Sequence, residues 1–285
     1  MKSVHSDWVR AMDIDREQAA FAWQTGIWDR MSDVYLREID RRFETVVTGV
    51  LARAGLRPGQ RVLDLGTGTG AVAARASEIV GPSGHIVGVD ISREMLAQAR
   101  RRFLESNLAN VTLQEGRAEE IPADDAAFDV VLASLSLMFA IDRLAAAQEI
   151  ARVLRPGGRF VAAVWGGPDQ CDLVRFQQIA GSFAPAPPAS GVGPGALGDP
   201  MPFMTQLEAA GVRVWVEIEE LGFDFDSFES AWDVFAGVTA AQLAPERQQE
   251  AKDAVLAAFY PEGDGPRHFR NVALFVIGER DRSSR

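Results

Sequence analysis

A glycine-rich turn with two acidic residues near it is the part of this sequence best suited to chemistry. The run 62–70 reads Val-Leu-Asp-Leu-Gly-Thr-Gly-Thr-Gly, an apolar strand followed by a glycine at every second position. Glycines at this spacing permit a tight turn and let the backbone approach a ligand closely. Asp64 stands inside the strand, and Asp90 ends the next predicted strand. We interpret this combination as a site for a nucleoside cofactor.

Asp64 indicates which nucleoside cofactor the site binds. Gly66, Gly68 and Ala71 also satisfy the dinucleotide pattern, with Asp90 at a suitable distance for a ribose hydroxyl, so an NAD-dependent oxidoreductase is one alternative. A carboxylate two residues before the turn does not suit a pyrophosphate, whereas it suits a ligand that carries an ammonium group. The loop 115–122 follows the third predicted strand and is suited to hold the edge of a base.

Composition excludes several classes of function. The chain has 285 residues, 47% of them hydrophobic, and a net charge of −11, which argues against sequence-independent nucleic-acid binding. Its single cysteine, Cys171, excludes a disulfide framework and a cysteine-based zinc site, and we predict no metal. The sequence shows no signal peptide and no apolar run of about 18 residues, so we expect a cytoplasmic protein without a membrane partner, as a monomer or homodimer.

Strands and helices alternate in the middle of the chain, which predicts a parallel sheet with helices on both faces. The predicted strands there are 61–65, 85–90, 110–114, 128–134 and 159–165, and the helices between them are 69–80, 92–105 and 142–154. Further on we predict helices at 204–210, 227–236 and 245–259 and strands at 212–220 and 271–277. Strand 212–220 alternates between apolar and polar residues, which is typical of a half-buried strand near a sheet edge.

Two segments outside this alternation are candidates for the substrate side. Residues 1–57 form a helical, aromatic-rich N-terminal segment that packs on the domain or closes over a ligand as a lid. Residues 58–285 form the cofactor-binding domain, and 166–211 read as an insertion on its substrate side, with a long loop rich in proline and glycine.

The motifs together resemble a class I S-adenosylmethionine-dependent methyltransferase, of the broad group that includes the ubiquinone/menaquinone-biosynthesis C-methyltransferases. The resemblance covers residues 60–165 and rests on the segments 62–70, 87–96, 116–122, 128–139 and 152–158. It implies a Rossmann-like α/β fold with a seven-stranded, mostly parallel sheet and an antiparallel last strand. It also implies S-adenosyl-L-methionine as cofactor and methyl transfer to carbon, oxygen or nitrogen of a small-molecule acceptor.

The resemblance also implies roles for individual residues. The turn glycines would let the backbone approach the methionine part of the cofactor, Asp64 would anchor its amino group, and Asp90 would hold the ribose hydroxyls. Ile91 would pack on adenine, Ala118 would donate its backbone N–H, and the Ser134 carbonyl would face the amino group. The complete set of predicted cofactor-binding residues is Asp64, Gly66, Thr67, Gly68, Asp90, Ile91, Met95, Arg117, Ala118, Glu119, Ser134 and Tyr35.

One position departs from the family. Where its members commonly have an aspartate that accepts the adenine amino group, this chain has Arg117, which cannot accept a hydrogen bond. Glu119, two residues further on, is the candidate replacement.

The sequence gives less information about the acceptor. The last predicted strand begins at Asn271 and, as the resemblance implies, runs antiparallel to the others, so that residues just before it lie at the active edge. We therefore predict that His268 and Tyr260 are catalytic residues that line the acceptor pocket. Aromatic residues that could reach this edge, among them Trp28 and Phe139, suit a flat or apolar acceptor or face a sulfonium.

Two readings from other classes remain open beside methyl transfer and the NAD-dependent oxidoreductase. One is an enzyme that consumes S-adenosylmethionine by intramolecular displacement and releases methylthioadenosine. The other is a non-catalytic binding module.

Overall fold

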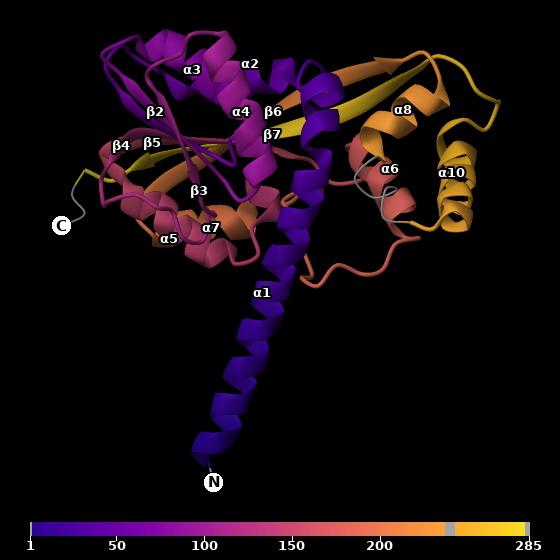
Figure 1. Ribbon diagram of the computed structural model, residues 1–285, viewed down its shortest axis with the longest axis horizontal. Coiled ribbons are helices and arrows are strands. Elements are labelled where there is room, and N and C mark those ends of the chain that lie inside the picture. The colour runs from indigo at the N-terminus through magenta and orange to yellow at the C-terminus, as the bar shows by residue number, and fades with distance from the viewer. Residues whose placement is uncertain (1, 237–242, 283–285) are drawn as a thin grey trace.

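The computed structural model describes residues 2–236 and 243–282, and for residues 2–16 only the course of the backbone. Its centre is a seven-stranded sheet in the order β3-β2-β1-β4-β5-β7-β6 (Figure 1). The strands are β1 (Arg61–Leu65), β2 (His85–Asp90), β3 (Val111–Glu115), β4 (Phe128–Ser134), β5 (Leu154–Trp165), β6 (Val212–Phe225) and β7 (Arg267–Arg280). The first five are parallel, and β7 runs antiparallel to β5 and β6. The predicted fold class is therefore confirmed.

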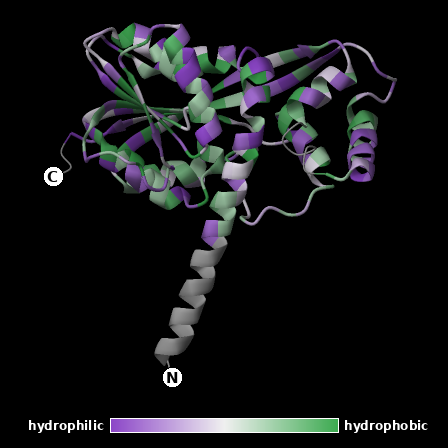
Figure 2. Ribbon diagram, viewed as in Figure 1, coloured by the Kyte–Doolittle hydropathy of each residue, from purple (hydrophilic) through white to green (hydrophobic). Residues whose placement is uncertain are grey.

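Helices cover both faces of the sheet. Figure 1 shows α2, α3 and α4 on one face and α5 and α7 on the other. Their bounds are α2 (Glu44–Ala54), α3 (Ala71–Val80), α4 (Arg93–Glu105), α5 (Arg143–Val153) and α7 (Met201–Ala209). With both faces covered, a central strand needs apolar side chains in both directions, and Val130, Val131 and Leu132 of β4 are all buried. Hydrophobic residues accordingly line the central strands (Figure 2).

The strand order creates the place for a ligand. β1 pairs with β2 on one side and with β4 on the other, so the connections that leave β1 and β4 diverge over opposite faces of the sheet. Ligands of open α/β sheets bind in the crevice at such a switch point, beyond the carboxyl ends of the strands. The glycine turn after β1 and the short 3-10 helix η2 (Leu137–Phe139) after β4 both lie at this edge.

The last two strands are longer than the sequence pattern predicted. β6 continues to Phe225 and β7 already begins at Arg267, with the pair Phe225↔Arg267 closing their ladder. The extension is stabilised by buried aromatic residues, since Phe223 and Phe225 of β6 and Phe269 of β7 are all covered. The helices α6 (Asp172–Gly181), α8 (Phe228–Phe235) and α10 (Pro245–Phe259) pack around this extension, apart from the cofactor end of the sheet (Figure 1).

The N-terminal segment is one long helix that ends in a local irregularity. α1 spans Lys2–Val34, and its N-terminal end extends away from the domain (Figure 1). A π-helical turn, η1 (Tyr35–Ile39), follows, in which the N–H of Asp40 donates to the carbonyl of Tyr35 at 3.0 Å. Such turns occur often at functional sites because they re-aim the side chains on either side. No helix in the described residues is both long and apolar enough to cross a membrane.

Candidate cofactor site

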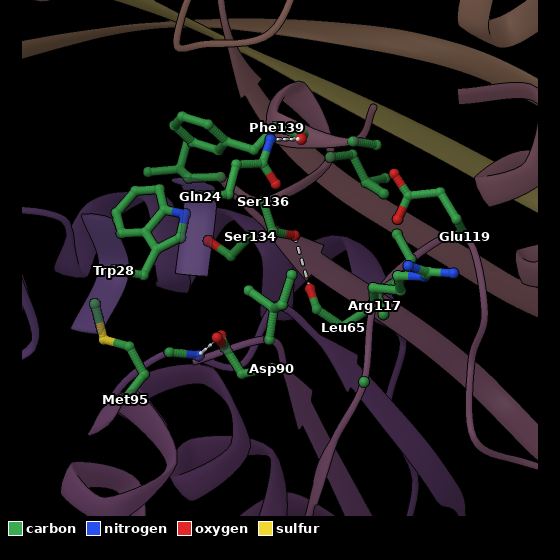
Figure 3. Close-up of a pocket in the computed structure, with 18 of the residues that line it drawn as sticks. Gln24, Trp28, Leu65, Asp90, Met95, Arg117, Glu119, Ser134, Ser136 and Phe139 are labelled. Carbon is green, nitrogen blue, oxygen red and sulfur yellow. Dashed lines mark hydrogen bonds between the residues drawn. The ribbon is translucent and has the colours of Figure 1, made fainter. Parts of the chain in front are cut away.

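A pocket lies at the carboxyl ends of β1, β2 and β4 and is closed on one side by α1 (Figure 3). Of the residues predicted to bind a cofactor, most line it: Gly66, Gly68, Asp90, Ile91, Met95, Arg117, Ala118, Glu119, Ser134 and Tyr35. Asp64 and Thr67 are buried beside the turn and do not line the pocket. The structure therefore brings the predicted set together around one cavity, although the contacts to a cofactor remain a prediction.

The glycine turn owes its shape to residues in the left-handed region of backbone conformation. Gly66 has φ +72° and Gly68 has φ +54°. The amides of Gly66 and Thr67 both donate to the Val89 carbonyl of β2, at 2.8 and 2.9 Å, which holds the turn against the neighbouring strand. A Cβ on Gly66 would lie 2.3 Å from Cβ of Ser136, whereas a Cβ on Gly68 would meet nothing within 4 Å. Gly66 is therefore required by packing, and Gly68 faces open space.

These two glycines give a matched pair of variants. We expect Gly66→Ala to lower the free energy of unfolding by more than about 2 kcal/mol, because strain from positive φ adds to a clash with Ser136. Gly68→Ala should cost only about 1–2 kcal/mol, from the backbone strain alone. Urea unfolding of both variants checks the difference. Equal destabilisation would show that the turn relaxes away from Ser136.

Asp64 is a buried carboxylate with one oxygen satisfied and one not. Its Oδ2 accepts from the Thr67 hydroxyl at 2.7 Å and from the Ala73 amide at 3.1 Å. Its Oδ1 is buried and has no hydrogen-bond partner among the described residues. Burial is the main cause that raises the pKa of Asp64 to about 7, against the opposing effect of the Thr67 hydroxyl. An unpartnered carboxylate oxygen beside a ligand pocket fits a group that brings an ammonium to it.

Asp90 holds the turn and the next helix at the same time. Its Oδ2 accepts from the Gly68 amide at 2.8 Å, and its Oδ1 accepts from the Ser92 amide at 2.9 Å. Burial raises its pKa to about 6, with the backbone donors opposing the shift. At neutral pH it is an ionised acceptor at the rim of the pocket, which is the group that two ribose hydroxyls require.

The far end of the pocket is built differently from the family pattern. The Arg117 guanidinium lies over the ring of Phe21, 4.2 Å from its centroid, and donates to Glu120 at 3.1 Å. Glu119 accepts from the amide of Ile141 at 2.6 Å, and burial raises its pKa. Arg117 therefore forms part of the wall by stacking, and Glu119 already has a backbone partner.

The N-terminal helix contributes residues that sequence reasoning did not assign to the cofactor. Phe21, Gln24 and Trp28 of α1 line the pocket together with Tyr35, as do Ser136 and Phe139 from the segment after β4. Trp28 and Phe139 were expected to be able to reach this edge, whereas nothing in the sequence pointed to Phe21, Gln24 or Ser136 individually. Tyr35 is kept neutral, because burial and then Asp40 raise its pKa.

Polar contacts fix the N-terminal segment on the domain. Asp29 of α1 accepts from the hydroxyl of Ser92, the N-cap of α4, at 2.6 Å. Asp40 accepts from the hydroxyl of Thr69 in the glycine turn at 2.7 Å and pairs with Arg102. The segment that covers the pocket is thus tied directly to the turn and to the helix that surround it.

The two predicted catalytic residues lie elsewhere. His268 belongs to β7 and pairs with Asp224 of β6 at 2.7 Å, with both side chains largely exposed to solvent. Tyr260 is buried against Phe228 and Phe269. Neither lines the pocket. Both residues were expected in a loop at the active edge, but β7 begins at Arg267 instead of Asn271. This part of the chain therefore belongs to the extension of β6 and β7 and to its aromatic cluster.

Comparison with known proteins agrees with this architecture. Residues 56–170 match the family model described as "Methyltransferase domain". The ubiquinone/menaquinone biosynthesis C-methyltransferase UbiE of Vibrio vulnificus is 41% identical over 116 residues, which are 40% of this chain and 45% of that protein. The protein of the same name from Ectopseudomonas mendocina is 35% identical over 163 residues, 55% of this chain and 61% of that protein. This chain thus spans about half the length of these relatives.

A solved structure shows the same fold over most of the chain. The YcgJ protein of Bacillus subtilis superposes with a TM-score of 0.62 and 21% identity, covering 84% of this chain and 99% of that one. The predictions of a methyltransferase and of its cofactor are confirmed at the level of the domain. Residues 56–170 of this chain are a methyltransferase domain of the S-adenosylmethionine-dependent, Rossmann-like class.

Proposed function

We propose that the chain transfers a methyl group from S-adenosylmethionine to a small-molecule acceptor. The observation that carries the proposal is the pair of buried carboxylates around the glycine turn. Asp64 has a free buried oxygen that suits an ammonium, and Asp90 presents an ionised acceptor that suits two hydroxyls. A cofactor with an amino acid at one end and a ribose in the middle brings both groups.

The described residues fit that cofactor. Gly68 faces open space, so its backbone leaves room for the amino-acid part, and Ile91 and Ala118 line the end proposed for adenine. When bound, the cofactor supplies an activated methyl group on a sulfonium. The chain's own task is then to hold the acceptor in line with that methyl and to exclude water. Phe21, Trp28 and Phe139 provide apolar cover for this purpose.

The pocket offers no free general base among its described residues. We place Asp90 at the ribose and Glu119 at the end proposed for adenine, so neither is assigned to the transferred methyl, and burial keeps Tyr35 a neutral phenol. A methyl transfer here therefore relies on an acceptor that is nucleophilic without help from the protein, and any proton it carries leaves when the methylated product is released to solvent. This inference replaces His268 and Tyr260, to which the geometry gives no contact with the reacting groups.

The test is to identify the products. The purified chain is incubated with S-adenosylmethionine and a metabolite extract, and the mixture is analysed by mass spectrometry. We expect S-adenosylhomocysteine together with a product that is heavier by one methylene. Methylthioadenosine in its place would establish the intramolecular displacement. Binding of NAD with no binding of S-adenosylhomocysteine in titration would establish an oxidoreductase.

A further inference from the structure

A second hollow adjoins the cofactor pocket and shares a wall with it. Gln24, Trp28 and Phe139 line both spaces. The remaining walls of this groove come from α1, from α6 and from the loop that follows α6. They are Trp23, Ile27, Val174, Gln177, Gln178, Gly181, Ala184, Pro185, Pro187, Val192, Gly193, Pro194 and Gly195. Of the described residues that line the groove, only Phe139 lies within the matched domain, residues 56–170.

The groove is apolar and carries no charge. Among the described residues that line it there is no acidic, basic, histidine, tyrosine or cysteine side chain. The rings of Trp28 and Phe139 meet edge to face, with centroids 4.8 Å apart at 88°, and form a corner at the shared wall. A charged ligand would lose its hydration here without a partner, whereas a flat apolar one would not.

Gln24 gives the shared wall a fixed polar group. Its side chain is 6% exposed, and its Nε2 donates to the backbone carbonyl of Phe139 at 2.6 Å. A carbonyl oxygen can only accept, so this contact fixes the orientation of the amide and leaves Oε1 as the free end. Figure 3 shows that oxygen turned into the pocket, on the side of Ser136. The wall between the two spaces thus presents a hydrogen-bond acceptor.

A second glutamine in the groove is held in the same way. Nε2 of Gln177 donates to the carbonyl of Phe235 at 3.0 Å, so its amide orientation is also fixed. Its Oε1 is buried and has no hydrogen-bond partner among the described residues. Because this oxygen is covered, Gln177 helps to build the wall of the groove and does not present an open acceptor. Gln24 therefore offers the accessible acceptor, at the wall that the groove shares with the cofactor pocket, whereas the Gln177 oxygen is covered.

We infer that this groove is the acceptor site and that it selects an uncharged, flat, apolar molecule that carries a hydroxyl or amine donor, with Gln24 as the positioning residue. The inference rests on the proposed function for its link to methyl transfer, but the binding preference stands on the groove itself. A carboxylate would face acceptor oxygens and no cation. A ketone or an ether of the same shape would bring an acceptor where a donor is needed.

Binding of matched naphthalene probes to the full chain tests this selectivity. We use isothermal titration calorimetry with 2-naphthol, 2-methoxynaphthalene and 2-naphthoate, each with and without saturating S-adenosylhomocysteine. The wild type should bind 2-naphthol roughly tenfold more tightly than either of the other probes, the effect of one hydrogen bond and of an unpaired charge. Gln24→Leu should reduce the ratio of 2-naphthol to 2-methoxynaphthalene affinities to about one.

Gln178→Leu is the matched control, because Gln178 lines the same groove but its side chain is exposed. It should leave the ratio within a factor of two. The inference is overturned if no probe binds the wild type, if 2-naphthoate or 2-methoxynaphthalene binds as tightly as 2-naphthol, or if Gln24→Leu leaves the ratio unchanged. Failure of the proposed function is a separate result, since it would appear as absent binding of S-adenosylhomocysteine.

Discussion

Replacing Asp90 with alanine should weaken binding of S-adenosylhomocysteine by at least about 100-fold. A hydrogen bond to a charged group contributes about 1.5–3 kcal/mol, and we propose that this carboxylate accepts two from the ribose. The same change frees the amides of Gly68 and Ser92, which now donate to Asp90 at 2.8 and 2.9 Å, so the turn also loses its support. Titration calorimetry at pH 8, where Asp90 is ionised, measures the loss.

Glu94→Gln supplies the control for this variant. Glu94 stands exposed in the first turn of α4, and the substitution removes the same unit of charge without touching the pocket. We expect its affinity to stay within about twofold of the wild type, since a single exposed charge is largely screened. If Asp90→Ala binds the ligand as well as Glu94→Gln does, the ribose is held elsewhere and the proposed site is wrong.

The sequence predicted well those strands and helices whose positions are determined by residues close together in the chain. Between 60 and 165 most strands are short runs rich in Val, Ile and Leu, and the turns 66–70, 81–84 and 155–158 carry glycine or proline, so these elements follow from neighbouring residues. The extension of β6 and β7 has no such local signal. Its length depends on packing against other elements. Phe235 of α8 covers Phe223 and Phe225. Phe176 of α6, which is distant in sequence, covers Phe269.

The same distinction applies to the pocket. Gly66 and Asp90 of the pocket, and the buried Asp64 beside it, could be predicted because they stand at or next to strand ends, whose positions the parallel topology fixes. Gln24 was missed, because its place depends on how α1 packs across the domain, through contacts such as that of Asp29 with Ser92. His268 was misplaced for a related reason. The predicted start of β7 was four residues too late, so the prediction put His268 in a loop, whereas the structure has it in the strand.

Asp64→Asn should stabilise the ligand-free protein at pH 8 while it weakens the binding of S-adenosylhomocysteine. An acid whose pKa is about 7 in the folded state and 3.8 otherwise binds more protons folded than unfolded between these values. The free energy of unfolding therefore falls as the pH rises from about 4 to about 7. Above this window the ionised carboxylate costs about 4 kcal/mol at most, since one pKa unit is worth about 1.4 kcal/mol.

Asparagine keeps an acceptor for Thr67 and Ala73 but does not ionise. The gain in the free energy of unfolding over the wild type should therefore reach about 2–4 kcal/mol at pH 8 and shrink by about 2 kcal/mol at pH 5.

Thr67→Val should change the pH dependence of stability in the opposite direction to Asp64→Asn. It removes a donor to the ionised carboxylate, so its destabilisation should grow as the pH rises. Urea unfolding at both pH values measures each variant. A difference between Asp64→Asn and the wild type that does not change with pH would contradict the titration of Asp64. Bound S-adenosylhomocysteine should reduce the stability gain of Asp64→Asn over the wild type. Its ammonium beside Oδ1 would favour the ionised carboxylate of Asp64, so the charge that destabilises the ligand-free protein is the one that binding requires.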